Sequence, residues 1–194
     1  MILFLLTWLG LVLIRPQEYP ALADMGLPLL PIAMLAALAA WMLGNQRRPL
    51  IQPTYLLLAA FVVVGMLSMV ANGWVGGARI RFFQFLPALI TLLLVTQACH
   101  LPRNCLRIMW MIALCAVVLT IHGIEQVKLG QGWTGMPTVQ DGRIQYVGIF
   151  SDPNDLAMLF IIAIPMALFM GARGGALGLR RLFWWGVAGL LLYG

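Results

Sequence analysis

Charged residues are scarce in this chain of 194 residues, and acidic residues are the scarcest. Only 9% of the residues are charged, with 12 Lys and Arg against 6 Asp and Glu, whereas 62% are hydrophobic. A soluble domain of this length does not need so much apolar surface, so the composition predicts a protein that crosses a membrane several times. The basic residues stand singly or in pairs between apolar runs, and this spacing argues against nucleic acid as a partner.

Histidine and cysteine are also few, with 2 and 3 residues. Cys99, Cys105 and Cys115 have neither the spacing of a zinc site nor an even number, and we interpret them as small apolar residues near helix ends. The chain has no phosphate-binding glycine loop, no nucleophile elbow and no zinc motif. These absences argue against an ATPase or a soluble-type hydrolase, and we expect neither a metal nor a cofactor.

Seven apolar segments predict an all-α fold, a polytopic transmembrane helix bundle. Several are shorter than the ~20 residues that a bilayer requires, so flanking residues must extend them. We expect the first segment to be a retained helix, because no basic residue precedes it as in a signal peptide. The last segment reaches Gly194 before it is long enough to cross, which favours one transmembrane domain, 1–194, that is the N-terminal part of a longer protein. The segments are Ile2–Ile14, Leu27–Leu43, Thr54–Val70, Phe82–Val95, Leu106–Ile121, Leu156–Met170 and Leu182–Tyr193.

The basic residues between these segments predict the orientation. With the N-terminus in the cytoplasm, the inner connections carry Arg47, Arg48 and five further arginines but no acid, whereas the outer connections carry all 6 acids of the chain. The bias is modest, so the opposite orientation stays open. The longest connection, Glu125 to Asn154, is then a periplasmic loop, and a loop of this length is more often functional than idle.

The sequence Asp152-Pro153-Asn154-Asp155 leads into the sixth apolar segment. Asp152 is a good N-cap, Pro153 suits the first helical position and Asp155 suits the third. Capping alone is one interpretation, and capping combined with a binding site is the other. A helix that begins at the outer surface directs free N–H groups toward an anion, but the two carboxylates reduce this attraction, so Arg143 would have to restore it.

Two arginines, Arg79 and Arg81, precede the fourth segment on the expected outer side, where basic residues are disfavoured. A guanidinium group can bind phosphate in a bidentate way, which suggests an anionic partner. Contact with lipid headgroups is the alternative. Because residues two apart face different ways on a helix, both arginines can reach one ligand only if the turn at Gly76-Gly77 is irregular.

His122 and Glu125 are three residues apart, which would place them on one helix face. There a carboxylate could orient the imidazole as a general base for glycosyl transfer. The alternative is an ordinary solvated helix end.

The segment from Gly148 to Ala157, followed by an apolar helix with Pro165, resembles the O-antigen ligase and O-antigen polymerase superfamily. Members carry a pattern like Gly-x-Phe-x-(Asn/Asp)-Pro-Asn-x-Leu-Ala at the start of a membrane helix, often with an arginine just before it. The early sequence Arg15-Pro-Gln-Glu-Tyr-Pro20 is also similar to the N-terminus of some members. The residues that match the pattern are Arg143, Gly148, Phe150, Asp152, Pro153, Asn154, Leu156 and Ala157.

This resemblance implies a multi-pass glycosyltransferase of the bacterial inner membrane. Such enzymes take a glycan from polyprenyl pyrophosphate at the periplasmic face and transfer it to a hydroxyl of lipid A core, another glycan or a protein. They use no nucleotide sugar and no metal. By position, the candidate pyrophosphate-binding residues here are Arg79, Arg81, Arg143 and Asn154, and the residues that would shape the helix start are Asp152, Pro153 and Asp155.

One departure from the family concerns a second, larger outer loop that contains a histidine near the C-terminus. These 194 residues contain no such loop, so His122 would be only a stand-in for that base. Two other functions stay open, a transporter or flippase subunit and a non-catalytic membrane assembly protein. Transporters favour ionisable groups in mid-span, whereas the polar residues of this chain gather at one face, which favours chemistry at the membrane interface.

Overall fold

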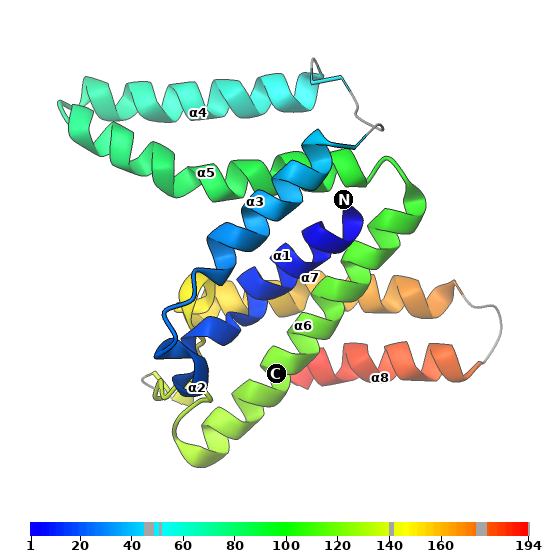
Figure 1. The fold of residues 1–194 in the computed structure, drawn as a ribbon. Coiled ribbons are helices and arrows are strands. Elements are labelled where there is room, and N and C mark those ends of the chain that lie inside the picture. The colour runs from blue at the N-terminus through cyan, green and yellow to red at the C-terminus, as the bar shows by residue number, and fades with distance from the viewer. Residues whose placement is uncertain (45–48, 51, 140–141, 174–177, 194) are drawn as a thin grey trace.

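The computed structural model describes residues 1–44, 49–50, 52–139, 142–173 and 178–193. These residues are mainly helical and include no β-strand, only an isolated bridge between Gln131 and Pro137. Figure 1 shows the helices running back and forth between two ends of the molecule. In chain order they are α1 (Ile2–Ile14), η1 (Pro16–Glu18), α2 (Pro20–Ala23), α3 (Leu29–Met42), α4 (Pro53–Ala71), α5 (Val75–Ala98), α6 (Pro102–Leu129), η3 (Gly148–Phe150), α7 (Pro153–Ala172) and α8 (Leu179–Tyr193).

Each of the seven predicted apolar segments lies largely within one of these helices. Among the described residues, four helices, α4, α5, α6 and α7, are long and apolar enough to cross a membrane. Helices α1, α3 and α8 have only 13, 14 and 15 residues. The chain is therefore a helical protein with four candidate membrane spans, and the crossing of the membrane by all seven segments stays a prediction. The expected inner residues Arg47 and Arg48 lie outside the described residues.

Two helices extend well beyond the predicted segments. Helix α5 begins at Val75 and runs regularly through Gly76 and Gly77, so the irregular turn that would let Arg79 and Arg81 reach one ligand is not found there. Helix α6 continues past Glu125 to Leu129 and ends at Gly130, whose φ of 75° is a conformation that glycine adopts easily. The connection to α7 therefore begins at Gly130 and is shorter than expected.

Proline determines where several helices begin. Pro53, Pro102 and Pro153 stand in the first turn of α4, α6 and α7. The fixed φ of proline suits that position, and its missing N–H is not needed there.

Two clusters of buried side chains hold most of the helices together. In the first, α6 packs against the α7–α8 hairpin, with Trp184 fully buried and several alanines at the helix contacts. In the second, α1 and α3 pack against the C-terminal part of α5 and the start of α6. Small residues such as Ala37 and Ala113, both fully buried, allow the helices to approach closely.

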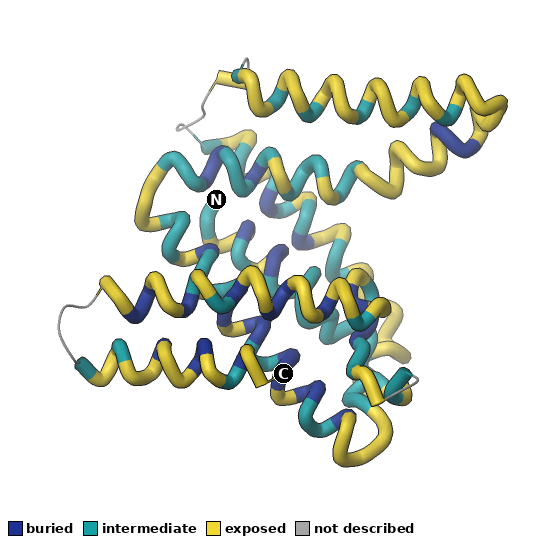
Figure 2. The backbone as a smooth tube through the Cα atoms, turned by 180° about the vertical axis from the view of Figure 1, so that it is seen from behind, coloured by how far each residue is buried: buried dark blue, intermediate teal, exposed yellow. Residues whose placement is uncertain are grey.

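The α4–α5 hairpin is different. No residue of α4, all of which are described, is buried. Figure 2 shows the α4–α5 hairpin extending away from the rest of the bundle, with exposed residues along most of α4. Helix α5 joins the second cluster only through its C-terminal half, where Leu94, Gln97 and Ala98 are buried.

Candidate functional site

Two segments from opposite parts of the chain meet at one end of the bundle. The turn after α1 contacts the segment that leads into α7. The Tyr146 hydroxyl donates a hydrogen bond to the Ile14 carbonyl, and its oxygen lies 2.9 Å from the Tyr19 hydroxyl in a second hydrogen bond. Burial, followed by the bond with Tyr19, raises the pKa of Tyr146 well above its usual range. Tyr146 therefore stays a neutral hydroxyl that joins the two segments.

Arg15 has the most unusual backbone at this junction. It ends α1 with φ 46° and ψ 55°, and among the described residues it is the only non-glycine residue with positive φ. Its Nη1 forms a 2.5 Å ion pair with Glu18 Oε1, while its buried Nε has no hydrogen-bond partner among the described residues. The left-handed backbone caps α1, because the Arg15 N–H donates to the Leu11 carbonyl. The unsatisfied buried Nε has no such structural explanation, and it makes Arg15 a candidate binding residue.

Gly148, a residue of the family-like pattern, lies directly against this arginine. Its φ is 73°, and a Cβ added to it would stand 2.1 Å from Arg15 Nε and 2.3 Å from Arg15 Cζ. Glycine is thus required at position 148 for two reasons, the left-handed backbone and the close approach of the guanidinium.

An elongated groove runs from this junction between α1, α3 and α5. Its cavity volume is about 630 Å³, and its lining is mainly apolar. Arg15, Gln84 and Ile149 are part of that lining. Gln84 Oε1 accepts a 3.0 Å hydrogen bond from Arg81 Nη1, so the groove ends beside two arginines that come from different helices.

The start of α7 has the predicted capping geometry. Asp152 is the N-cap, and its Oδ1 accepts the N–H of Asn154 at 2.7 Å, with Pro153 and Asp155 in the first turn. Asp152, Asn154 and Asp155 are all exposed. Two exposed carboxylates at a helix N-terminus oppose the binding of an anion, so any anionic ligand here needs positive charge from elsewhere. The binding role of Asn154 stays a prediction.

The predicted arginines lie on separate surfaces. Arg143 is exposed in the loop before α7, and its backbone carbonyl accepts the Val139 N–H at 3.0 Å. Arg79 and Arg81 lie on the regular first turns of α5, about 200° apart around the helix axis. No recorded contact in the described part of the chain joins Arg79, Arg81 and Arg143.

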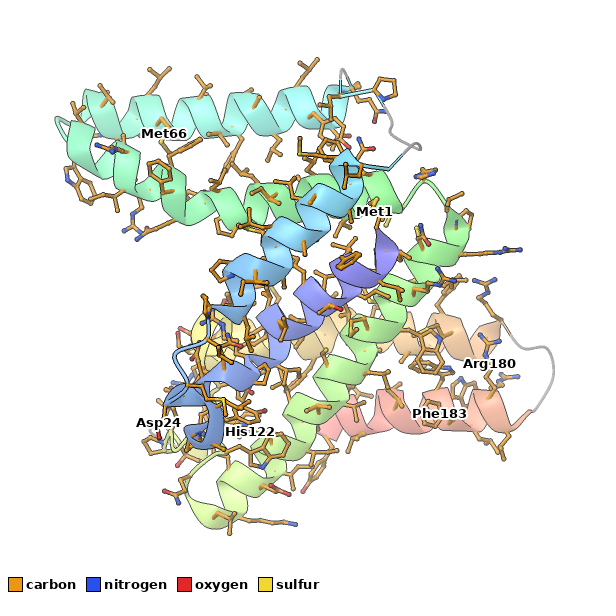
Figure 3. All side chains as sticks on the ribbon, in the orientation of Figure 1. Met1, Asp24, Met66, His122, Arg180 and Phe183 are labelled. Atoms are coloured by element: carbon orange, nitrogen blue, oxygen red, sulfur yellow. The ribbon has the colours of Figure 1, made fainter. Side chains whose placement is uncertain are left out.

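His122 is fully buried, which sequence reasoning did not anticipate. Its ring lies between Trp133 and Tyr146, with centroid distances of 5.2 and 4.8 Å. Neither ring nitrogen has a hydrogen-bond partner among the described residues. The expected partner, Glu125, instead accepts a hydrogen bond from Trp133 Nε1. Figure 3 shows His122 and Asp24 toward one end of the bundle and Arg180 at the opposite end. The catalytic role of His122 stays a prediction.

Gln126 was not identified from the sequence, although its side chain connects two segments of the loop between α6 and α7. Its Nε2 donates to the carbonyls of Met136 and Pro137 at 3.0 and 3.2 Å, and its Oε1 accepts the Gln145 N–H at 3.0 Å. The sequence also indicated no role for Arg15 itself, although the motif Arg15–Pro20 pointed to this part of the chain. Nothing near Gln126 in the sequence indicates its contacts.

The described residues include no group of three or more His, Cys, Asp or Glu side chains that could hold a metal ion. The polar groups at this end of the bundle can instead neutralise an anion, through Arg15, Arg81 and Arg143. No family model, no curated protein and no solved structure matches this chain.

Proposed function

We propose that this protein is an O-antigen ligase-like membrane glycosyltransferase that uses a polyprenyl-pyrophosphate-linked glycan as donor. One observation carries the proposal. The two segments that resemble the family, Arg15–Pro20 and Gly148–Ala157, contact each other through Arg15 and Gly148 although most of the chain separates them. They meet beside an apolar groove with a basic end, which suits a lipid that carries an anionic headgroup.

In the proposed reaction, an acceptor hydroxyl attacks the anomeric carbon of the donor glycan. A new bond forms between the acceptor oxygen and that carbon, and the bond from the carbon to the pyrophosphate oxygen breaks. The electron pair leaves with the pyrophosphate, and a base takes the hydroxyl proton. Guanidinium groups stabilise the charge that develops on the leaving group, and this is the role proposed for Arg79, Arg81 and Arg143. The acceptor is a lipid A core, a glycan or a protein hydroxyl.

The proposal includes a bacterial inner-membrane location with the N-terminus in the cytoplasm and seven membrane segments. The junction of the two family-like segments then faces the periplasm, where the donor glycan is displayed. The opposite end, which includes Arg173, Arg180 and Arg181, then faces the cytoplasm, as the inside-positive rule favours.

The test replaces Arg143 or Asn154 with alanine in the native host and measures carrier-linked glycan. Arg173→Ala is the matched control, because Arg173 is an exposed arginine at the other end of α7. We expect Arg143→Ala to cause unligated carrier-linked glycan to accumulate on the outer leaflet, where an impermeant probe detects it in spheroplasts.

The same assay separates the competing functions. Accumulation on the inner leaflet would indicate a flippase subunit. Unchanged glycan levels in both variants would contradict a transferase and favour an assembly protein.

A further inference from the structure

The groove between α1, α3 and α5 has apolar walls and a single charged lining residue. Trp8, Leu30 and Met34 contribute to the walls, and Arg15 supplies the charge. Its cavity volume of about 630 Å³ lies within the range of ligand pockets. Such a site is complementary to an amphiphile with an apolar chain and an anionic head.

The turn at the charged end has unused hydrogen-bonding capacity. Arg15 Nε and both amide atoms of Gln17 are buried without hydrogen-bond partners among the described residues. Leaving such atoms unsatisfied destabilises the folded protein. The left-handed backbone at Arg15 adds strain. The backbone conformation also serves folding, because the Arg15 N–H caps α1 through the Leu11 carbonyl. The unsatisfied Arg15 Nε has no such role, and an anionic ligand in the groove would accept its N–H.

Without a ligand, the Glu18 carboxylate pairs with the Arg15 guanidinium. The Arg15–Glu18 contact is the one ion pair among the described residues, and the two side chains are 23% and 34% exposed. Since both side chains are partly solvated, the ion pair contributes little to stability, and a doubly charged headgroup can displace the carboxylate.

We infer that Arg15 binds the phosphate headgroup of a membrane lipid whose chain occupies this groove, and that Glu18 is the internal counter-ion that the headgroup displaces. The inference rests on the proposed function, because the lipid would be the polyprenyl-linked donor. It assigns the main phosphate contact to Arg15 rather than to the exposed arginines. Ile149 also lines the groove, so a headgroup at Arg15 lies next to the segment that leads to the start of α7.

The experiment measures binding to the purified full chain in nanodiscs. The probes are a polyprenyl phosphate, the uncharged polyprenol of equal length, and inorganic pyrophosphate alone. We expect the wild-type protein to bind polyprenyl phosphate about tenfold or more tightly than polyprenol, because charge-assisted hydrogen bonds are the strong ones. Inorganic pyrophosphate should bind much more weakly than polyprenyl phosphate, because it makes no contact with the groove.

Three variants separate the parts of the site. Arg15→Gly suits the left-handed backbone, and it should abolish the preference for the phosphate while leaving polyprenol binding unchanged. Glu18→Gln removes the competing carboxylate and should strengthen polyprenyl phosphate binding severalfold. Ala88→Phe narrows the groove and should weaken both lipids equally. Arg173→Gln, at an exposed arginine at the opposite end of the bundle that does not line the groove, is the control and should change nothing.

A preference for phosphate that survives Arg15→Gly would overturn the inference, as would weaker binding in Glu18→Gln or equal binding of pyrophosphate and polyprenyl phosphate. Should Arg15→Gly fail to fold, Glu18→Gln still decides, because it leaves the arginine in place. The proposed function can fail while the inference holds. In that case the preference for polyprenyl phosphate depends on Arg15, but Arg143→Ala causes no accumulation of carrier-linked glycan in cells.

Discussion

Replacing Gly148 with alanine tests the junction on which the proposed site depends. The added Cβ would meet Arg15 at 2.1–2.5 Å from Nε, Cζ and Cδ. Because these atoms belong to a partly buried side chain that is paired with Glu18, the guanidinium must leave its position. The substitution therefore strains the backbone at position 148 and also removes the contact between Arg15 and Gly148.

The loss in the free energy of unfolding follows from these two effects. A left-handed alanine costs about 1–2 kcal/mol relative to glycine. Displacing Arg15 adds the loss of the ion pair, about 0.2–1 kcal/mol, and an off-rotamer side chain, about 0.5–1.5 kcal/mol. Gly135→Ala is a matched control, since Gly135 has a φ of 78° and nothing within 4 Å of its added Cβ. Gly148→Ala should thus destabilise by about 1–2 kcal/mol more than Gly135→Ala, which is roughly 2–8 °C in the midpoint of thermal unfolding.

Thermal unfolding of the detergent-solubilised protein, followed by tryptophan fluorescence, measures this difference. The double variant Arg15→Gly/Gly148→Ala completes the cycle. Without the arginine, Gly148→Ala should lose only as much stability as Gly135→Ala loses. Equal midpoints for Gly148→Ala and Gly135→Ala in the wild-type background would refute the contact.

Of four further predictions, three concern residues at the same end of the bundle as Arg15, and the fourth concerns Cys99 at the opposite end. Asp152→Ala should lower the free energy of unfolding by about 1 kcal/mol, because the N-cap hydrogen bond is lost. Asp152→Asn should retain most of that hydrogen bond's contribution, and the thermal midpoints of the two variants measure the difference. Tyr146→Phe leaves the Ile14 carbonyl without its donor and should cost about 1–3 kcal/mol, whereas Tyr193→Phe, at a tyrosine that is 78% exposed, should cost nothing measurable. His122→Leu removes two unsatisfied ring nitrogens and should leave stability unchanged or raise it, so a large loss in the thermal midpoint would show that the imidazole has a hydrogen-bond partner. Burial, followed by contacts with a neighbouring thiol, raises the pKa of Cys99 to about 11, so its thiol stays protonated at neutral pH. In a variant whose other two cysteines are serine, burial, the larger cause, still raises the pKa of Cys99. The rate of maleimide labelling should therefore keep rising with pH beyond pH 9, and a plateau near pH 9 would contradict the effect of burial.

The helices could be predicted where local chemistry determines their ends. The predicted first segment, Ile2–Ile14, coincides with α1. The start of α7 follows from Asp152 and Pro153, because capping depends only on neighbouring residues. Apolar runs therefore located the helices, and capping residues refined their ends.

Helix ends within polar sequence were predicted less well. Polar residues such as Glu125 do not stop a helix, and α6 ends only at Gly130, where the backbone turns left-handed. The pair Gly76-Gly77 indicated an irregular turn, yet α5 includes both residues. Gly77 instead makes room for the ring of Trp74, since a Cβ there would lie 2.1 Å from that ring.

The candidate site could be predicted only in part. The pattern around Gly148 pointed to the segment before α7, but no local periodicity relates it to Arg15. Their contact depends on how α1, α6 and α7 pack, and on the Tyr146 hydroxyl reaching the Ile14 carbonyl. Likewise, the spacing of His122 and Glu125 suggested that the carboxylate orients the imidazole, whereas Glu125 accepts a hydrogen bond from Trp133, whose ring packs against His122.

The exposed position of α4, beside α5 and outside both core clusters, affects how the protein responds to its lipid environment. Helix α4 has 19 residues and α5 has 24, which gives lengths of about 28 and 36 Å. Helix α4 has no buried residue, but it packs against α5, and the Tyr55 hydroxyl shares hydrogen bonds with Thr96 and Gln97 of α5. The two helices therefore respond to the bilayer together, as one hairpin.

Gln84, on the same hairpin, lines the groove beside Arg15. A thinner bilayer favours a greater tilt of the hairpin. Because the Trp8–Thr91 hydrogen bond joins α5 to α1, that tilt would be concentrated in the part of α5 before Thr91, where Gln84 lies, and would change the shape of the groove there.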